Sequence, residues 1–138
     1  MDLAKFQEAR GQFARYVELR PDDASGHYAL GLSYTNLQLT SEAKSEFEKS
    51  IALQPAQTES YFQLGVIDLD AKDYDSAEQK LQRALGRDPK HAGALAALGR
   101  TKLEEKKYGD AADFLQRAIA SDVFKILNPS DTATTDHP

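Results

Sequence analysis

The residues best suited to chemistry are four aspartates in one short segment, Asp68, Asp70, Asp73 and Asp75. Closely spaced carboxylates are the ligands that calcium prefers in a helix–loop–helix site. This segment lacks the central glycine and the terminal bidentate glutamate that such a loop requires. We therefore interpret the aspartates as solvated residues or helix caps, with Asp73 capping a helix that opens at Tyr74.

Other residues that could act as metal ligands or nucleophiles are scattered along the chain. The three histidines, His27, His91 and His137, are not spaced as ligands of one metal ion, and there is no cysteine. No serine or threonine has a general base beside it in sequence, and no glycine-rich phosphate loop is present. The sequence therefore predicts no catalytic residue, no cofactor and no metal site, and we expect that the protein is not an enzyme.

The positions of glycine reveal an internal repeat. Gly31, Gly65 and Gly99 each follow a leucine, and each step between them is 34 residues. A period of this length with helix-pair units is typical of binding scaffolds rather than catalysts. The same period aligns an alanine, a large apolar residue and a proline in successive units: Ala43, Phe47 and Pro55, then Ala77, Leu81 and Pro89, then Ala111, Leu115 and Val123 in place of proline.

The repeated residue types predict how two helices of one unit pack. Glycine inside a helix costs about 1 kcal/mol relative to alanine, so a close helix contact is expected to compensate. We predict that Phe47, Leu81 and Leu115 on the second helices fill the space beside these glycines. The prolines at positions 21, 55 and 89 are expected to close the second helices.

Taken together, the leucine–glycine, alanine, apolar and proline positions of residues 1–125 resemble those of a tetratricopeptide repeat (TPR) array. The position that this family usually fills with tryptophan holds His27, Tyr61 and Leu95 instead. The resemblance implies an all-α solenoid of antiparallel helix pairs, wound as a right-handed superhelix of about seven helices. It also implies a non-catalytic scaffold for protein–protein interaction.

The repeat register divides the chain into five parts. Residues 1–20 correspond to the second helix of a truncated repeat, three repeats span 24–57, 58–91 and 92–125, and residues 126–138 form a C-terminal tail. The expected helices cover 2–19, 24–38, 41–53, 58–71, 74–87, 92–105 and 108–126. Two interpretations of the first part remain open, an excised piece of a longer array or an unpaired half-repeat.

Charge and hydropathy narrow the class of partner. The net charge of −5 over 138 residues opposes a general phosphate-binding surface, so we expect no nucleic acid partner. No run of about 18 apolar residues is present, so we expect no membrane partner. The lack of cysteine is compatible with a reducing cytosol and does not exclude an oxidising compartment. A protein or peptide partner remains.

Binding is expected on the concave wall, which in arrays of the family that this chain resembles is lined by the first helices. The helix face beside each leucine–glycine pair presents the candidate groove residues. They are Tyr28, Leu32, Thr35 and Asn36 in the first repeat, Glu59, Phe62, Val66, Leu69 and Asp70 in the second, and Ala96, Arg100, Leu103 and Glu104 in the third. An apolar centre with a charged edge favours an apolar or amphipathic peptide or helix as the ligand.

Several alternatives stand beside this interpretation. Chaperone adaptors of the same family hold a terminal carboxylate with lysine, asparagine and arginine, and only Arg100 fits that scheme here. We expect Arg100 to pair with Glu104 one turn on. Phe62 and Leu32 could instead pack against neighbouring helices. The second function considered is a structural or self-assembly segment of a longer repeat protein without an external ligand, including a homo-oligomer formed through the exposed N-terminal helix.

Overall fold

The computed structural model describes residues 2–127. These residues form seven α-helices and contain no strand: α1 (Leu3–Leu19), α2 (Ala24–Asn36), α3 (Thr40–Leu53), α4 (Thr58–Asp70), α5 (Tyr74–Arg87), α6 (Ala92–Glu104) and α7 (Tyr108–Leu127). Each helix end lies within two residues of the end expected from the sequence. None of the described helices is long and apolar enough to span a membrane.

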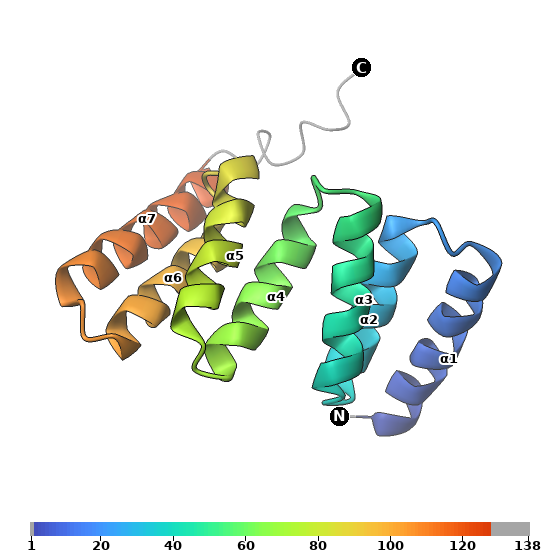
Figure 1. The fold of residues 1–138 in the computed structure, drawn as a ribbon. Helices are drawn as coiled ribbons and strands as arrows, with labels where there is room; N and C mark the ends of the chain where they lie inside the picture. The colour runs from blue at the N-terminus through green and yellow to red at the C-terminus, as the bar shows by residue number, and fades with distance from the viewer. Residues whose placement is uncertain (1, 128–138) are drawn as a thin grey trace, which may run out of the picture.

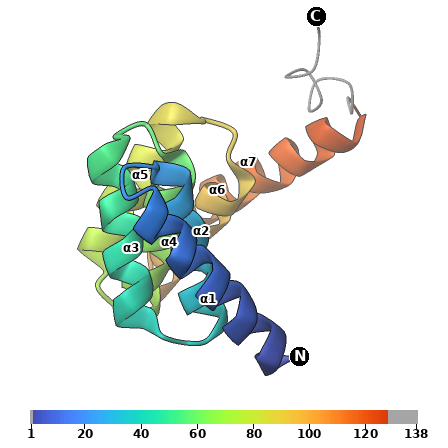
Figure 2. The ribbon, with the colours of Figure 1, turned by 90° about the vertical axis from the view of Figure 1, so that its right-hand side faces the viewer.

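The helices lie in a row with α1 and α7 at its opposite ends (Figure 1). Within the row α2 packs on α3, α4 on α5 and α6 on α7, and successive pairs meet through α3–α4 and α5–α6 contacts. α1 packs on α2, and α4 also contacts α6. The fold is therefore an all-α solenoid, as the resemblance implied. In the view turned by 90°, the C-terminal part of α7 projects away from the other helices (Figure 2).

The repeat bounds read from the sequence remain our proposal for how the solenoid divides. α2 and α3 fall within 24–57, and α4 and α5 fall within 58–91. α7 continues to Leu127, so residues 126 and 127 are helical and do not belong to the expected tail. Residues 128–138, which make up the rest of that tail, lie outside the described residues.

Close helix contacts occur at the three repeated glycines. A Cβ atom added at Gly31 would lie 2.6 Å from Cε1 of Phe47, and one added at Gly65 would lie 2.6 Å from Cγ of Leu81. At Gly99 the corresponding distance to Cδ2 of Leu115 is 2.7 Å. These separations are too short for a real side-chain atom, so the backbone of each first helix rests directly on a side chain of the second helix. The predicted packing role of the glycines is confirmed.

Two clusters of apolar side chains form the core between the helices. The smaller cluster centres on Ala43, Phe47 and Leu64, and joins α2, α3 and α4. The larger cluster extends from Leu69 and Leu81 to Ala118, and joins α4 through α7. Because the core continues from pair to pair, each first helix is held on both sides by second helices.

The turns combine side-chain caps with an unusual backbone conformation. The Asp23 carboxylate accepts hydrogen bonds from Ser25 N and Gly26 N at the start of α2. Asp73 accepts one from Ser76 N at the start of α5, so its predicted role as a cap is confirmed. Each turn from a first to a second helix contains a residue with φ near +60°, namely Gln38, Lys72 and Lys106. These three positions again differ by 34 residues, so the turn geometry repeats with the sequence.

Candidate functional site

The candidate groove residues lie on three first helices and differ widely in exposure. Tyr28, Leu32, Phe62 and Val66 are half-buried on α2 and α4, whereas Thr35, Asn36, Glu59, Asp70, Ala96, Arg100, Leu103 and Glu104 are exposed. Leu69 is only 2% exposed and belongs to the larger core cluster. Its assignment to the groove is therefore corrected, because its side chain points into the contact with α5 and α6 and is closed to a ligand.

Phe62, a candidate groove residue of α4, lies against the start of α6. The Phe62 ring lies 4.8 Å from the His91 ring, and a Cβ atom at Gly93 would lie 2.9 Å from Cζ of Phe62. Phe62 therefore packs partly on α6, as one of the alternative interpretations holds, and keeps part of its ring open. The absence of a side chain at Gly93 is what makes room for the ring.

A histidine links Glu59 to the first turn of α6. His91 Nδ1 accepts a hydrogen bond from Ala94 N at 2.9 Å, so it caps the helix. Nδ1 is then an acceptor, and the proton of the neutral ring lies on Nε2, which donates to the Glu59 carboxylate at 2.6 Å. Glu59 is thus held at the groove edge by a side chain of the following helix pair.

Tyr28 and Leu32 are candidate groove residues of α2 and rest on the smaller core cluster. The Tyr28 ring centroid lies 5.7 Å from that of Phe47. Burial raises the pKa of Tyr28, and the negative charge of the nearby Glu59 raises it further. Tyr28 therefore stays a neutral hydroxyl beside an acidic edge.

Arg100 forms an ion pair across two first helices. Its guanidinium donates to the Asp70 carboxylate at 2.8 Å, so the expected pairing with Glu104 is wrong. Glu104 instead accepts a hydrogen bond from the Tyr74 hydroxyl at 3.5 Å. Because both members of the Arg100–Asp70 pair are exposed, the pair contributes at most about 1 kcal/mol and mainly orients the two groove side chains.

Thr35 and Asn36 end α2 and differ in how they are held. The Thr35 hydroxyl donates to the carbonyl oxygen of Gly31 at 3.0 Å, one turn back in the helix. This bond turns the polar group of Thr35 toward its own backbone and away from a ligand. Asn36 is exposed at the last position of the helix.

Buried ion pairs between helices hold the first helices in place, and no local sequence pattern marks them. Lys80 Nζ lies 2.7 Å from the Asp68 carboxylate, and Lys102 Nζ lies 2.9 Å from that of Glu78. Asp68 is only 5% exposed, so its interpretation as a solvated residue is wrong. Burial alone would raise the pKa of Asp68, but hydrogen bonds from Lys80 and Ser76 and the charge of Lys80 together lower it.

His27 is a buried histidine with a partner on each ring nitrogen. Nδ1 lies 2.8 Å from Oε1 of Glu46 on α3, and Nε2 lies 2.7 Å from the carbonyl oxygen of Pro21. Lys49 donates to the second oxygen of Glu46 at 3.0 Å. His27 therefore ties α2 to α3 and to the preceding turn, which agrees with the packing position that the repeat register assigned to it.

Three of the four aspartates in the acidic segment have a structural role. Asp68 and Asp70 pair with Lys80 and Arg100, and Asp73 caps α5. Among residues 2–127 no group of three or more histidine, aspartate or glutamate side chains is arranged to hold a metal ion. Within the acidic segment, Asp68, Asp70 and Asp73 therefore serve to position helices.

Comparison with known proteins agrees with this geometry. The sequence matches the tetratricopeptide repeat family over residues 24–57 and again over residues 68–124. No curated protein matches it in sequence. These two segments together cover about two thirds of the chain.

Solved structures with the same fold share little sequence with this chain. MamA superposes with a TM-score of 0.80 at 19% identity, over 91% of this chain and 74% of MamA. The 41-end form of MamA from Desulfovibrio magneticus RS-1 gives 0.77 at 20% identity, over 89% of this chain and 70% of that one. PilF of Pseudomonas aeruginosa gives 0.77 at 21% identity over 86% of this chain, which spans about half of PilF (54%). At such identities the likeness shows the fold alone. The two family matches and the repeating helix pairs together establish that the chain belongs to the tetratricopeptide repeat family.

Proposed function

We propose that the chain is a non-catalytic scaffold that binds an apolar or amphipathic peptide or helix in a groove formed by α2, α4 and α6. Repeats of this family generally mediate protein–protein interactions. The observation that carries the proposal is that four apolar side chains on two successive first helices are only half-buried, namely Tyr28, Leu32, Phe62 and Val66. Such side chains can bury their remaining apolar surface against a ligand, since they are already held in place by the core beneath them.

The edge of the groove suggests the polar character of the ligand. Glu59, Asp70 and Glu104 place three carboxylates along α4 and α6, and Arg100 neutralises one of them. Leu103 adds an exposed apolar side chain at the α6 end. An amphipathic helix with lysine or arginine beside its apolar face fits this combination, because opposite charges at a rim speed association and select the partner.

Replacing Leu32 and Phe62 together with serine is expected to weaken binding of such a peptide at least tenfold. Truncating two central apolar anchors typically costs more than 1 kcal/mol for each. The measurement uses peptides selected from a helical display library against the wild-type protein, followed by fluorescence anisotropy. The control is Leu53→Ser, which makes the same kind of change at a more exposed leucine on the second helix α3, outside the groove.

Two outcomes separate the groove from other surfaces. Loss of binding in the double variant with retention in the Leu53→Ser protein, both with an unchanged helical circular dichroism spectrum, supports the groove. Equal affinity for all three proteins contradicts it. The net charge of −5 and the family's typical lack of catalysis support two further parts of the proposal, the absence of a nucleic acid partner and of enzyme activity.

The second candidate function is self-assembly, and a specific surface on α7 favours it. Ile119, Val123 and Leu127 recur at four-residue steps and line a hollow of about 460 Å³. Ile119 is 63% exposed, although it is a large apolar residue. On α1, which the sequence favoured for self-association, Val17 is buried and Tyr16 packs on Gly26. We therefore place the contact between copies on α7, where more apolar surface is open.

Changing Ile119 to glutamate is expected to convert a self-associated protein into a monomer. A charge in the middle of an apolar helix face opposes its burial against a second copy. Sedimentation equilibrium at high protein concentration measures the effect, and Phe6→Glu tests the α1 alternative under the same conditions. If the wild-type protein and both variants are monomeric at every protein concentration measured, this second function is ruled out.

A further inference from the structure

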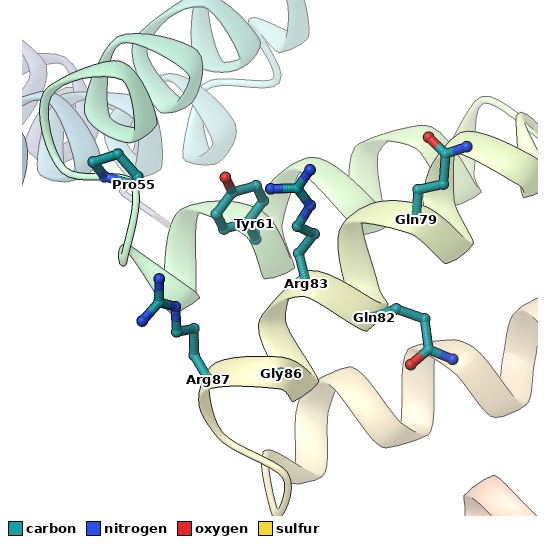
Figure 3. A pocket seen from close by; sticks show the side chains of 7 residues that line it. All are labelled: Pro55, Tyr61, Gln79, Gln82, Arg83, Gly86 and Arg87. Carbon is teal, nitrogen blue, oxygen red and sulfur yellow. The ribbon is translucent and has the colours of Figure 1, made fainter.

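A pocket of about 550 Å³ lies on the α5 side of the molecule, apart from the groove (Figure 3). Arg83 and Arg87, one turn apart on α5, line it together with Gln79 and Gln82. Tyr61 of α4 and Pro55 from the α3–α4 turn complete the wall. The Arg83 guanidinium lies 5.8 Å from the centroid of the Tyr61 ring, so the aromatic ring supports one of the two cations.

The two arginines have no acidic partner within residues 2–127. Neither forms an ion pair there, whereas Lys49, Lys80, Arg100 and Lys102 each pair with a carboxylate. Two like charges at positions i and i+4 of a helix repel each other. The helix dipole stabilises the positive charge of Arg87 in the last turn of α5. This stabilisation does not explain why no carboxylate lines the pocket. Two guanidinium groups thus lie beside one pocket whose lining contains no carboxylate.

The repeat itself provides an internal comparison, because the position of Arg83 recurs as Lys49 and Arg117. The pocket beside Lys49 contains Glu48 where the α5 pocket has Gln82, and Lys49 pairs with Glu46. Glu78, Asp110 and Asp113 line the pocket beside Arg117. Of these three equivalent positions, the one on α5 is surrounded by amides in place of carboxylates.

We propose that the α5 pocket binds the phosphoryl group of a phosphorylated side chain on a partner protein. Two guanidinium groups match the charge of a phosphate dianion, and each can donate two parallel hydrogen bonds to its oxygens. The Gln79 and Gln82 amides and the Tyr61 hydroxyl supply further donors around the same space. The volume admits a side chain with its terminal phosphate, and the aromatic ring of Tyr61 offers an apolar surface for the atoms that carry it.

This site is distinct from the proposed groove. Tyr61 and Phe62 are neighbours in α4, and consecutive helical residues point about 100° apart around the axis. Tyr61 therefore contributes to the pocket on the α5 side while Phe62 contacts the start of α6. None of the candidate groove residues lines the pocket. One chain could therefore hold a peptide in the groove and a phosphorylated segment on a different face of α4.

The test is a nuclear magnetic resonance titration with three peptides of one uncharged sequence that carry phosphoserine, glutamate or serine at the centre. We expect the phosphopeptide to shift the side-chain Nε–H signals of Arg83 and Arg87 and to bind at least five times more tightly than the glutamate peptide. Inorganic phosphate is expected to shift the same two signals at higher concentration. The double variant Arg83→Gln with Arg87→Gln is expected to weaken phosphopeptide binding at least tenfold.

Arg117→Gln is the matched control, because Arg117 has the same repeat position and also lies beside a ring, 5.5 Å from the centroid of Phe114. This variant and the groove variant with Leu32→Ser and Phe62→Ser are expected to bind the phosphopeptide as the wild type does. Equal binding of the phosphoserine and serine peptides overturns the proposal. Equal binding of the phosphoserine and glutamate peptides, or an Arg117→Gln effect as large as that of the double variant, also overturns it.

Discussion

Replacing Phe47 with alanine is expected to lower the free energy of unfolding by about 3–5 kcal/mol. Phe47 is 0% exposed, and its ring lies against the backbone at Gly31 and beside Tyr28. The deletion leaves a cavity between α2 and α3 that Gly31 cannot fill, since glycine has no side chain to move into it. Because whole domains are stable by about 5–15 kcal/mol, this single change removes a large part of the total. Urea denaturation followed by circular dichroism measures it.

A leucine on the same helix provides the control for Phe47→Ala. Leu53 is 44% exposed at the last position of α3, so Leu53→Ala is expected to cost less than about 1 kcal/mol. Amide hydrogen exchange measures where along the chain stability is lost. In a repeat array the loss is expected to be local, because the total stability is a sum of terms for single repeats and for the interfaces between neighbouring repeats. Amide protection in Phe47→Ala is expected to fall first in α2 and α3. A uniform loss along α2 to α7, or equal effects of the two variants, contradicts this packing.

Replacing Gly65 with alanine is expected to destabilise the protein by about 1–3 kcal/mol, although alanine is the better helix former by about 1 kcal/mol. The new Cβ atom would lie 2.6 Å from Cγ of Leu81 and 3.4 Å from the carbonyl oxygen of Ala77. Cγ is the branch point of a fully buried leucine, so it cannot swing aside as the end of a long side chain would. The helices α4 and α5 must therefore separate. The midpoint of urea denaturation reports the change.

Gly11 is a helical glycine that alanine can replace without a steric clash. Nothing lies within 4 Å of a Cβ atom added there, so Gly11→Ala is expected to stabilise the protein by about 0.5–1 kcal/mol. The double variant Gly65→Ala with Leu81→Ala is expected to lose less than the sum of its single changes, because the second change removes the obstructing side chain. A stabilising effect of Gly65→Ala, similar to that of Gly11→Ala, shows that the helix contact is looser than these distances indicate.

The fold followed from the sequence because each repeated position has a packing role that its residue type can meet. Small residues recur at 31, 65 and 99 where two helices touch, and large apolar residues recur at 47, 81 and 115 where they fill the contact. Prolines two residues after α1, α3 and α5 stop the second helices. These signals are local or periodic, so a single sequence contains them.

The partners of charged side chains did not follow from the sequence, since they depend on distances between helices. The rule for neighbours one turn apart predicts that Arg100 pairs with Glu104, but its partner is Asp70 of the preceding helix pair. Buried Asp68 meets Lys80 across the α4–α5 contact, and no local pattern marks that pair. Leu69 appeared on the groove face because the helix face was extended by one residue too many toward the core.

The backbone conformation of the turns between first and second helices could not be predicted for a different reason. Lys72 and Lys106 adopt a positive φ, a conformation that glycine and asparagine adopt more readily. A lysine in the sequence therefore does not indicate this turn geometry. The α5 pocket shows the same limit. The i, i+4 spacing of Arg83 and Arg87 can be read from the sequence, but the lack of carboxylates around them depends on α4 and on the α3–α4 turn.

The proposal of a binding surface on the first helices is tested most directly by mapping where a selected peptide binds. Amide and methyl signals of the isotope-labelled protein are followed during titration with a library-selected helical peptide. We expect the largest shifts at Tyr28, Leu32, Phe62 and Val66, with smaller shifts at Arg100 and Leu103 on α6. Shifts confined to α3, α5 and α7, with the signals of α2, α4 and α6 unchanged, would contradict the proposed groove.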